Sequence, residues 1–312
     1  MKKILIIVLA MLAPCLPTAN AQQSETGLVE IFCGIDLGYA DTNWMRLYDV
    51  RIPLKPGMKW HMGRDWQFAF QGIIPIINEG YTFRDRKYEM IQVDHVVLSK
   101  QFHFDSWHQH VKLSAGLFGL GRWGGDLQWM MPVTDWLLLK ARGGITRSWF
   151  LGCDMHNYSI GDFGHDWLAT GTAGANIYLK RWNIEGRVEG GRYIAEDYGM
   201  QFDVMRHFSH CTIDLFYQLR MGNRLKSLVD DMTDRANGGF KVVMMIPPYK
   251  KSDHLRAGRV VFRPASNFRL TNNVRSDSRS MRTYTTDPEE NERELNLDVN
   301  WGVRVSEPLN KK

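Results

Sequence analysis

Residues 29–40 read VEIFCGIDLGYA, and apolar side chains occupy every second position of this stretch. The apolar set is Val29, Ile31, Cys33, Ile35, Leu37 and Tyr39, and the intervening set is Glu30, Phe32, Gly34, Asp36, Gly38 and Ala40. Successive side chains of a β-strand point to opposite faces. The alternation therefore predicts a strand with one apolar face and one face of polar or small residues.

The same alternation recurs along the chain, with charges of both signs on the polar face. It is clearest in residues 136–149, 182–194, 211–221 and 295–305. These lengths suit the roughly 9 to 11 residues that a tilted transmembrane strand needs. If the polar face encloses an interior, ten charged residues are candidates to line it: Lys140, Arg142, Glu185, Arg187, Glu189, Asp203, Asp214, Arg220, Asp298 and Arg304.

Turn-like residues separate the alternating stretches and define a strand census. Strands are expected near 28–40, 45–54, 66–77, 90–104, 110–121, 126–133, 136–149, 167–179, 182–194, 199–208, 211–221, 238–247 and 295–305, with one or two more between 259 and 270. The glycine-rich stretch 119–125 is expected to make a tight turn. We predict an all-β fold, a single antiparallel transmembrane β-barrel of about 12 to 14 strands.

A soluble β-sandwich also alternates, so strand length and aromatic placement have to discriminate. Sandwich strands commonly have about 5 to 6 residues, roughly half the length of the runs seen here. Aromatic residues gather near the ends of the runs, as in the interfacial girdles of outer-membrane barrels; examples are Trp44, Trp60, Trp66, Trp149, Trp167 and Trp182. These features favour the barrel, and a secreted soluble β-protein is the alternative.

Residues 1–21 have the layout of a cleavable signal peptide. Lys2 and Lys3 precede an apolar core, and Ala19-Asn20-Ala21 provides a small-x-small cleavage site. A lipoprotein signal ending at Cys15 is a weaker alternative because Pro14 precedes that cysteine. Cleavage reduces 39 basic residues to 37 against 34 acidic ones, a net charge of +3, which does not suggest a nucleic-acid surface. The remaining cysteines, Cys33, Cys153 and Cys211, are odd in number and form no zinc-binding spacing.

Two segments within the expected barrel, residues 22–312, depart from the strand pattern. In residues 223–236, Leu225, Leu228, Val229 and Met232 recur at helical spacing, so a short loop helix is expected. Residues 272–294 are rich in Asn, Ser, Arg, Asp and Glu without an apolar period, and are expected to form a long polar or disordered loop.

Residues 190–199, GGRYIAEDYG, resemble a segment of the YjbH-like outer-membrane proteins. The resemblance continues through FDVMRHF at 202–208, GGF at 238–240 and IPP at 246–248, and includes the opening TGLVEI at 26–31. The residues that carry the motif are Gly190, Gly191, Arg192, Tyr193, Asp197 and Gly199. The resemblance implies an envelope role in exopolysaccharide production and export, with no catalytic residues to transfer.

The motif also has a purely structural interpretation as a strand-to-strand reversal. Its glycines permit a tight turn or a close backbone approach. Arg192, Glu196 and Asp197 are then expected to form a charged loop beside Tyr193 and Tyr198 at the membrane interface.

Two groups of residues invite a catalytic or metal-binding hypothesis. His108 and His110 would share one side of an extended segment, near His103 and Asp105, and could bind zinc or nickel, but a solvated turn is the favoured interpretation. Barrel hydrolases of the outer membrane use Asp and His groups, and this chain offers Asp230 and Asp231 with His207 and His210 for comparison. No catalytic-triad geometry follows from the spacing of these residues. We expect no catalytic residue, metal or cofactor.

The sequence thus predicts an outer-membrane β-barrel that assists exopolysaccharide or capsule export or assembly. A general porin-like channel is the main alternative, and a barrel hydrolase a lesser one. The expected partners are outer-membrane lipid, extracellular polysaccharide and envelope secretion proteins, with no nucleic acid. The expected location is the outer membrane, reached through the signal peptide.

Overall fold

A computed structural model describes residues 27–40, 49–79, 90–104, 109–149, 167–208, 211–223, 236–246, 255–262, 266–273, 281 and 283–288. Over these residues the protein is all-β, as predicted, with a single three-residue 3-10 helix, η3 (Lys180–Trp182). The strands are β1 (Leu28–Ala40), β2 (Asp49–Gly63), β3 (Trp66–Glu79), β4 (Gln92–Phe104), β5 (Gln109–Phe118), β6 (Arg122–Pro132), β7 (Leu137–Ser148), β8 (Leu168–Leu179), β9 (Ile184–Arg192), β10 (Asp197–His207), β11 (Cys211–Asn223), β12 (Ala236–Ile246), β13 (Leu255–Ala257), β14 (Val260–Phe262) and β15 (Ser266–Asn273).

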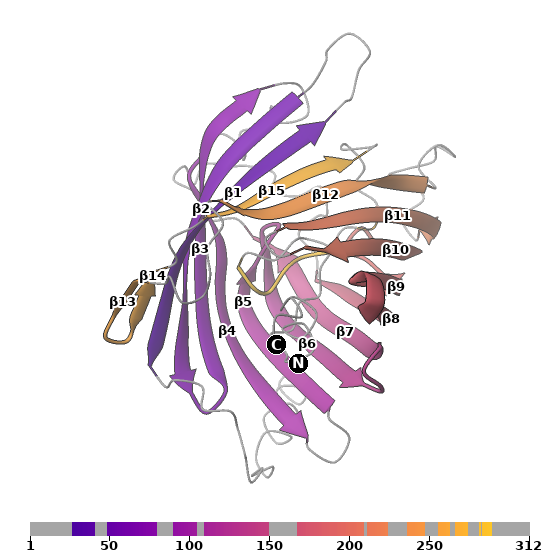
Figure 1. The fold of residues 1–312 in the computed structure, drawn as a ribbon, viewed down its shortest axis with the longest axis horizontal. Coiled ribbons are helices and arrows are strands. Elements are labelled where there is room, and N and C mark those ends of the chain that lie inside the picture. Colours follow the sequence, from indigo (N-terminus) through magenta and orange to yellow (C-terminus); the bar gives the residue numbers. More distant parts are fainter. Residues whose placement is uncertain are drawn as a thin grey trace.

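All fifteen strands belong to one sheet that curves strongly along its length (Figure 1). From β1 to β12, each strand pairs antiparallel with the next one in sequence. β15 pairs antiparallel with β12 and parallel with β1, so β1 has hydrogen-bonded neighbours on both sides. The short β13–β14 hairpin adds to the first residues of β1 through a parallel pairing of β14.

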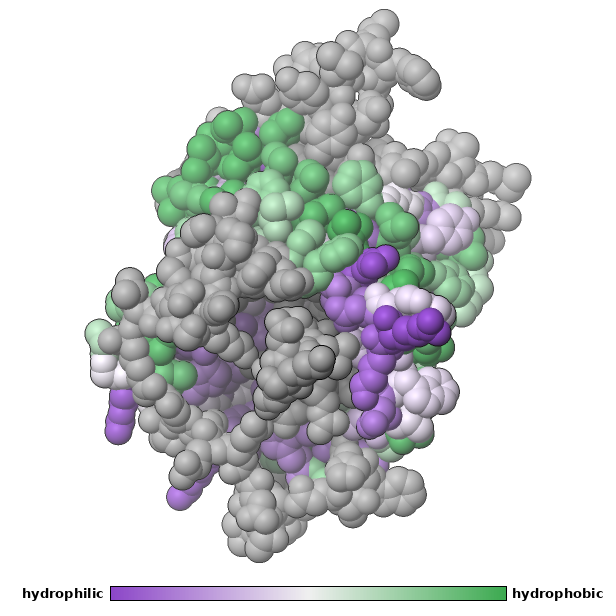
Figure 2. Space-filling model, viewed as in Figure 1, coloured by the Kyte–Doolittle hydropathy of each residue, from purple (hydrophilic) through white to green (hydrophobic). Residues whose placement is uncertain are grey.

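The two faces of the sheet are inverted relative to a soluble protein. In β7, alternate residues Lys140, Arg142 and Thr146 are buried, whereas Ile145 between them is 58% exposed. β11 follows the same rule, with Asp214 and Gln218 buried and Leu215 58% exposed. Hydrophilic residues line the hollow of the molecule in Figure 2, and apolar residues cover much of the neighbouring surface. The period of two that the sequence shows therefore separates a polar inner face from an apolar outer face.

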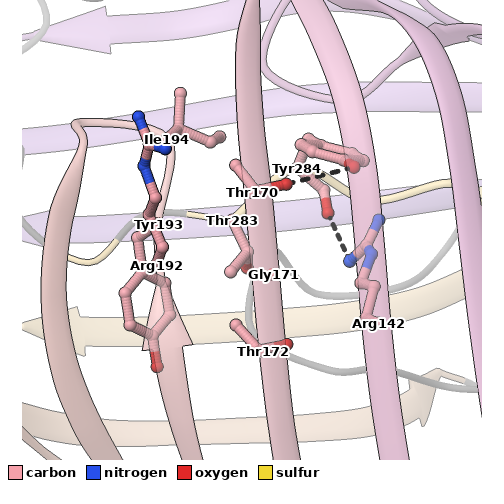
Figure 3. Close-up of a pocket in the computed structure, with 9 residues that line it drawn as sticks. All are labelled: Arg142, Thr170, Gly171, Thr172, Arg192, Tyr193, Ile194, Thr283 and Tyr284. Atoms are coloured by element: carbon pink, nitrogen blue, oxygen red, sulfur yellow. Dashed lines mark hydrogen bonds between the residues drawn. The ribbon is translucent and has the colours of Figure 1, made fainter.

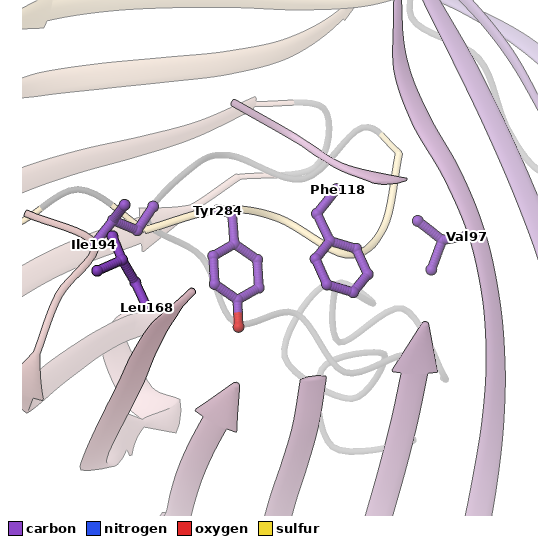
Figure 4. Packing of buried hydrophobic residues seen from close by; sticks show 5 residues of the cluster. All are labelled: Val97, Phe118, Leu168, Ile194 and Tyr284. Carbon is purple, nitrogen blue, oxygen red and sulfur yellow. The ribbon is translucent and has the colours of Figure 1, made fainter. Parts of the chain in front are cut away.

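A small apolar cluster interrupts the polar interior near one end of the strands. It consists of Val97, Phe118, Leu168, Ile194 and Tyr284, all buried (Figure 4). Four of these residues come from β4, β5, β8 and the β9–β10 turn. The fifth, Tyr284, comes from the stretch after β15, so a segment distant in sequence contributes to the interior.

Most strands lie within a few residues of their predicted positions, and the largest difference is in β2. The expected strand 45–54 instead spans Asp49–Gly63. Pro56 and Gly57 commonly end strands. Here they continue one, because both pair with β1, Pro56 opposite Cys33 and Gly57 opposite Phe32. A Cβ at Gly57 would lie 2.6 Å from the Phe32 ring, so this position needs glycine.

Several predictions concern residues outside the described ranges. The expected strand 295–305, the signal peptide 1–21, Cys153 and residues 224–235 of the loop helix all fall there. Residues 223 and 236, at the ends of the expected helix, belong to β11 and β12. Cys33 and Cys211 are free and lie on different strands, β1 and β11. Of the glycine-rich stretch 119–125, residues 119–121 form the predicted tight turn between β5 and β6, where Leu120 and Gly121 have φ of 66° and 62°, and residues 122–125 begin β6.

Candidate functional site

The inner face of the sheet is a polar wall held together by ion pairs. Lys140 on β7 pairs with Glu189 on β9 at 2.9 Å. Arg142 pairs with Asp126 on β6 at 2.7 Å, and Lys241 on β12 pairs with Asp214 on β11 at 3.4 Å. These charged groups are buried, and burial of a charge is tolerable when a partner of opposite sign is in contact. The stability of this polar wall therefore depends on each buried charge keeping its partner of opposite sign.

The ten predicted lining residues are distributed as follows. Six are buried on the inner face: Lys140, Arg142, Glu185, Glu189, Asp203 and Asp214. Arg187 and Arg220 are partly buried, and Arg187 donates to Glu185 at 2.8 Å. Asp298 and Arg304 lie outside the described residues. The structure thus brings the described charged candidates onto one interior surface.

Residues 281 and 283–288 form the most distinctive feature of this interior, and we refer to these residues as the strap. The strap lies within the curve of the strands (Figure 1) and has no regular secondary structure over 283–288. Met281, Tyr284, Thr285, Thr286 and Asp287 are all at most 4% exposed. The sequence predicts this region as a long polar loop, and burial of these residues was not foreseen.

Tyr284 is the centre of the strap's contacts. Its ring stacks on Phe118 of β5, with centroids 5.2 Å apart and an interplanar angle of 11°. The Arg142 guanidinium lies 4.3 Å from the ring centroid and also donates to the Tyr284 carbonyl oxygen at 2.9 Å (Figure 3). The Tyr284 hydroxyl donates to Asp126 at 2.7 Å. Burial raises the pKa of this phenol, so it stays protonated and able to donate.

The two threonines after Tyr284 bond to three further strands or turns. The Thr285 hydroxyl shares a 2.8 Å hydrogen bond with His95 Nε2 on β4. The Gly119 N–H in the β5–β6 turn donates to the Thr285 carbonyl oxygen at 3.0 Å. Gln128 on β6 donates to the Thr286 hydroxyl at 2.8 Å. Both hydroxyl groups thus bond to side chains of the inner wall.

Asp287 joins two lysines of the wall. Its carboxylate lies 2.7 Å from Lys59 Nζ on β2 and 3.6 Å from Lys112 Nζ on β5. Burial alone would raise the pKa of this carboxyl group, but the two ammonium groups outweigh burial and hold the pKa below its usual range. The Asp287 side chain is therefore ionised at neutral pH.

At its other end the strap meets the motif 190–199. The Met281 N–H donates to the Asp197 carboxylate at 2.5 Å, and the Met281 carbonyl oxygen accepts from Gln218 at 3.3 Å. Gly190, Gly191 and Arg192 end β9, and Arg192 pairs with Glu196 at 2.6 Å. The expectation for Tyr193 and Asp197 is wrong: both are buried in the interior, where they meet apolar and strap residues instead of solvent, and only Tyr198 is exposed.

Three glycines make room for the strap. A Cβ at Gly199 would lie 2.5 Å from Met281 Sδ, one at Gly144 would overlap the Tyr284 hydroxyl, and one at Gly119 would overlap the Thr285 hydroxyl. Gly143, next to Gly144, has open space at the corresponding position. The sequence does not reveal why these three positions need glycine, because glycine also occurs in ordinary strands and turns. The requirement follows only from the contacts of the three glycines with Met281, Tyr284 and Thr285.

The remaining candidate residues form no second site within the described ranges. His103 and His110 face each other across β4 and β5, with their Nδ1 atoms 2.5 Å apart, whereas Asp105 and His108 lie outside the described residues. Among the residues described, no group of three or more His, Cys, Asp or Glu could hold a metal ion. His207 contacts Glu185 at 3.0 Å and Thr212 at 3.2 Å; His210, Asp230 and Asp231 lie outside the described ranges.

The fold and the site define an all-β protein with an inverted sheet and an interior strap. Within the part of the chain that the structure describes, no helix is long and apolar enough to cross a membrane. No family model, no curated protein and no solved structure matches this chain.

Proposed function

We propose that this protein is an outer-membrane β-barrel that assists export or assembly of an extracellular polysaccharide without catalysing a reaction. The observation that carries the membrane assignment is the inverted sheet. Leu215, Val204 and Phe240 form an exposed apolar row across three adjacent strands, β11, β10 and β12. Water disfavours such a surface, whereas a lipid bilayer favours it.

The strand pairing supports closure of the sheet into a barrel. β1 to β12 and β15 form a ring of neighbours that returns to β1 through the parallel β1–β15 pair. A ring of thirteen strands needs one parallel pair, because up and down directions cannot alternate around an odd number. Closure would leave none of these thirteen strands as an edge with unpaired backbone groups, which a bilayer would penalise.

The lengths of the connections support an orientation in the outer membrane. At one end of the sheet, successive strands are joined through residues 64–65, 105–108, 133–136, 180–183 and 208–210. The first end also carries residues 247–265 between β12 and β15. At the other end the connections are residues 41–48, 80–91, 149–167 and 224–235 and the short turns 119–121 and 193–196, so four of the five long connections lie there. Outer-membrane barrels have short periplasmic turns and longer extracellular loops. The second end is therefore assigned to the cell exterior, consistent with export through the signal peptide expected at 1–21.

The polysaccharide role rests on the resemblance of residues 190–199 to the YjbH-like family. In this proposal the partners are outer-membrane lipid, the exported polysaccharide and envelope secretion proteins. A clean deletion strain should secrete less polysaccharide, and complementation with the intact gene should restore secretion. Unchanged secretion in the deletion strain would remove this role while leaving the barrel assignment in place.

The barrel assignment has its own test. The protein should fractionate with outer membranes and migrate faster on gels before boiling than after it, because intact barrels resist unfolding by detergent. Recovery in a soluble fraction, with a single mobility, would contradict membrane insertion.

A porin-like channel is the second candidate, favoured by the charged inner wall. The strap crosses this interior, so the intact protein should conduct poorly in planar bilayers. High steady conductance of the intact protein would favour the porin over an assembly or export factor.

A further inference from the structure

The strap presents to the inner wall the groups of an acidic sugar. Within four consecutive residues it offers a flat ring, three hydroxyl groups and a carboxylate, from Tyr284, Thr285, Thr286 and Asp287. Each group has its own partner on the wall. The partners come from β2, β4, β5, β6 and β7, so the site spans several strands of the sheet.

The position of the Tyr284 ring would accept a sugar ring. The ring of Phe118 lies nearly parallel to the Tyr284 ring, with the two centroids 5.2 Å apart. Aromatic faces carry negative charge that attracts the positively polarised C–H groups of a pyranose. Arg142 and Asp126 border the same position and already bind a carbonyl oxygen and a hydroxyl group of the strap. A planar donor and a carboxylate acceptor beside an aromatic face suit a polyhydroxylated ring.

The positions of the threonine hydroxyls extend the site along the wall. His95 and Gln128 each bond to one hydroxyl group at 2.8 Å. An imidazole and a carboxamide can both donate and accept hydrogen bonds, so neither requires a threonine in particular. Hydroxyl groups of a neighbouring sugar unit would satisfy them equally well.

Lys59 and Lys112 determine the charge of the ligand. Both ammonium groups contact the single carboxylate of Asp287, and Lys112 is buried. Loss of Asp287 from this position would leave two neighbouring cations in a poorly hydrated place, which favours an anion as the replacement. A uronic acid supplies such a carboxylate on a hydroxylated ring.

The strap is attached in a way that permits exchange. In the described residues, 283–288 join no strand ladder. The polar contacts to the wall are hydrogen bonds and ion pairs, and the apolar ones are confined to the Tyr284 ring, which packs in the small apolar cluster and under Arg142. A polysaccharide that reproduces these contacts can replace them one by one, without unfolding of the sheet.

We propose that the strap is an internal stand-in for an acidic glycan, and that the wall beneath it binds a uronic-acid-containing polysaccharide when the strap moves away. The inference rests on the proposed function and names the substrate class of the same interior. The strap then keeps the interior closed until an acidic chain competes for Phe118, Gln128, Lys59 and Lys112.

The test measures binding of an oligogalacturonate, and of a neutral maltooligosaccharide of equal length, to the full-length protein folded in detergent. A Tyr284→Ala/Asp287→Ala variant vacates the site and should bind the oligogalacturonate at least about tenfold more tightly than the wild type, because an intramolecular competitor is removed. Adding Lys112→Met to this variant should weaken binding about tenfold or more. Lys55→Met is the matched control, because Lys55 lies on the same strand as Lys59 but pairs with Asp36 rather than with Asp287.

A second variant keeps the inference testable if the double variant does not fold. Gly144→Ala places a Cβ against the Tyr284 hydroxyl and should loosen the strap while retaining its side chains. Variants that show heat-modifiable migration but bind no oligogalacturonate would overturn the inference, as would equal binding of the neutral oligosaccharide. A wild-type protein that does not insert into membranes would instead overturn the proposed function, so the two failures are distinguishable.

Discussion

Replacing Leu215 with arginine separates a lipid-facing sheet from a water-facing one. Leu215 is 58% exposed and lies between Val204 and Phe240 in the exposed apolar row. In water, a substitution at so exposed a position changes the free energy of unfolding by less than about 0.5 kcal/mol. On the lipid face of a barrel, an arginine at mid-depth lowers it by about 2–4 kcal/mol.

Val133→Arg is the matched control for depth. Val133 is also an exposed apolar residue, but it belongs to the short β6–β7 turn. Near a membrane interface the cost of an arginine falls to about 0–1 kcal/mol. Wild type and variants would be folded into phospholipid vesicles and titrated with urea, with tryptophan fluorescence as the signal. Equal stability of Leu215→Arg, Val133→Arg and the wild type would refute the claim that this face meets lipid.

Three further predictions concern the strap. Gly144→Ala should lower the melting temperature because its Cβ overlaps the Tyr284 hydroxyl. Gly143→Ala should leave the melting temperature unchanged, because the space beside Gly143 is open. Equal melting temperatures of the two variants would argue against the close contact between Gly144 and Tyr284. Because the folded-state pKa of Asp287 is lowered, its stabilising contribution is complete above the unfolded pKa and declines as pH falls through the folded value. Urea titrations should therefore show a larger loss of stability below about pH 4 in the wild type than in Asp287→Asn, which retains only the losses from the other carboxyl groups; matching acid profiles would contradict this. Deletion of residues 281–288 should raise conductance in planar bilayers, and unchanged conductance would mean that the strap does not close the interior.

The strands were predictable because their signal is local. In β7, the alternation of Leu139 and Ala141 with Lys140 and Arg142 follows from the geometry of an extended chain and needs no knowledge of neighbours. The same pattern identifies the residues of the inner face, including Glu185, Glu189 and Asp214. Strand ends were less certain, as β2 shows, because pairing with the neighbouring strand β1 carries the chain through Pro56 and Gly57.

The strap was not predictable in the same way. Residues 281–288 have no apolar period, and their polar composition alone describes a solvated loop. Their burial depends on partners that lie far away in sequence, such as Asp126 and Gln128, both 158 residues from the strap residue they contact. For the same reason Tyr193 and Asp197 were expected at an interface rather than in the interior.

By itself, the sequence determined that this chain forms long strands with one apolar and one charged face, because side-chain direction in a strand depends only on position along the chain. Only the tertiary structure decided which face is buried and which segment packs against it. Those outcomes depend on which strands meet and on whether Lys59 and Lys112 find Asp287, and contacts of that range leave no periodic signal in the sequence.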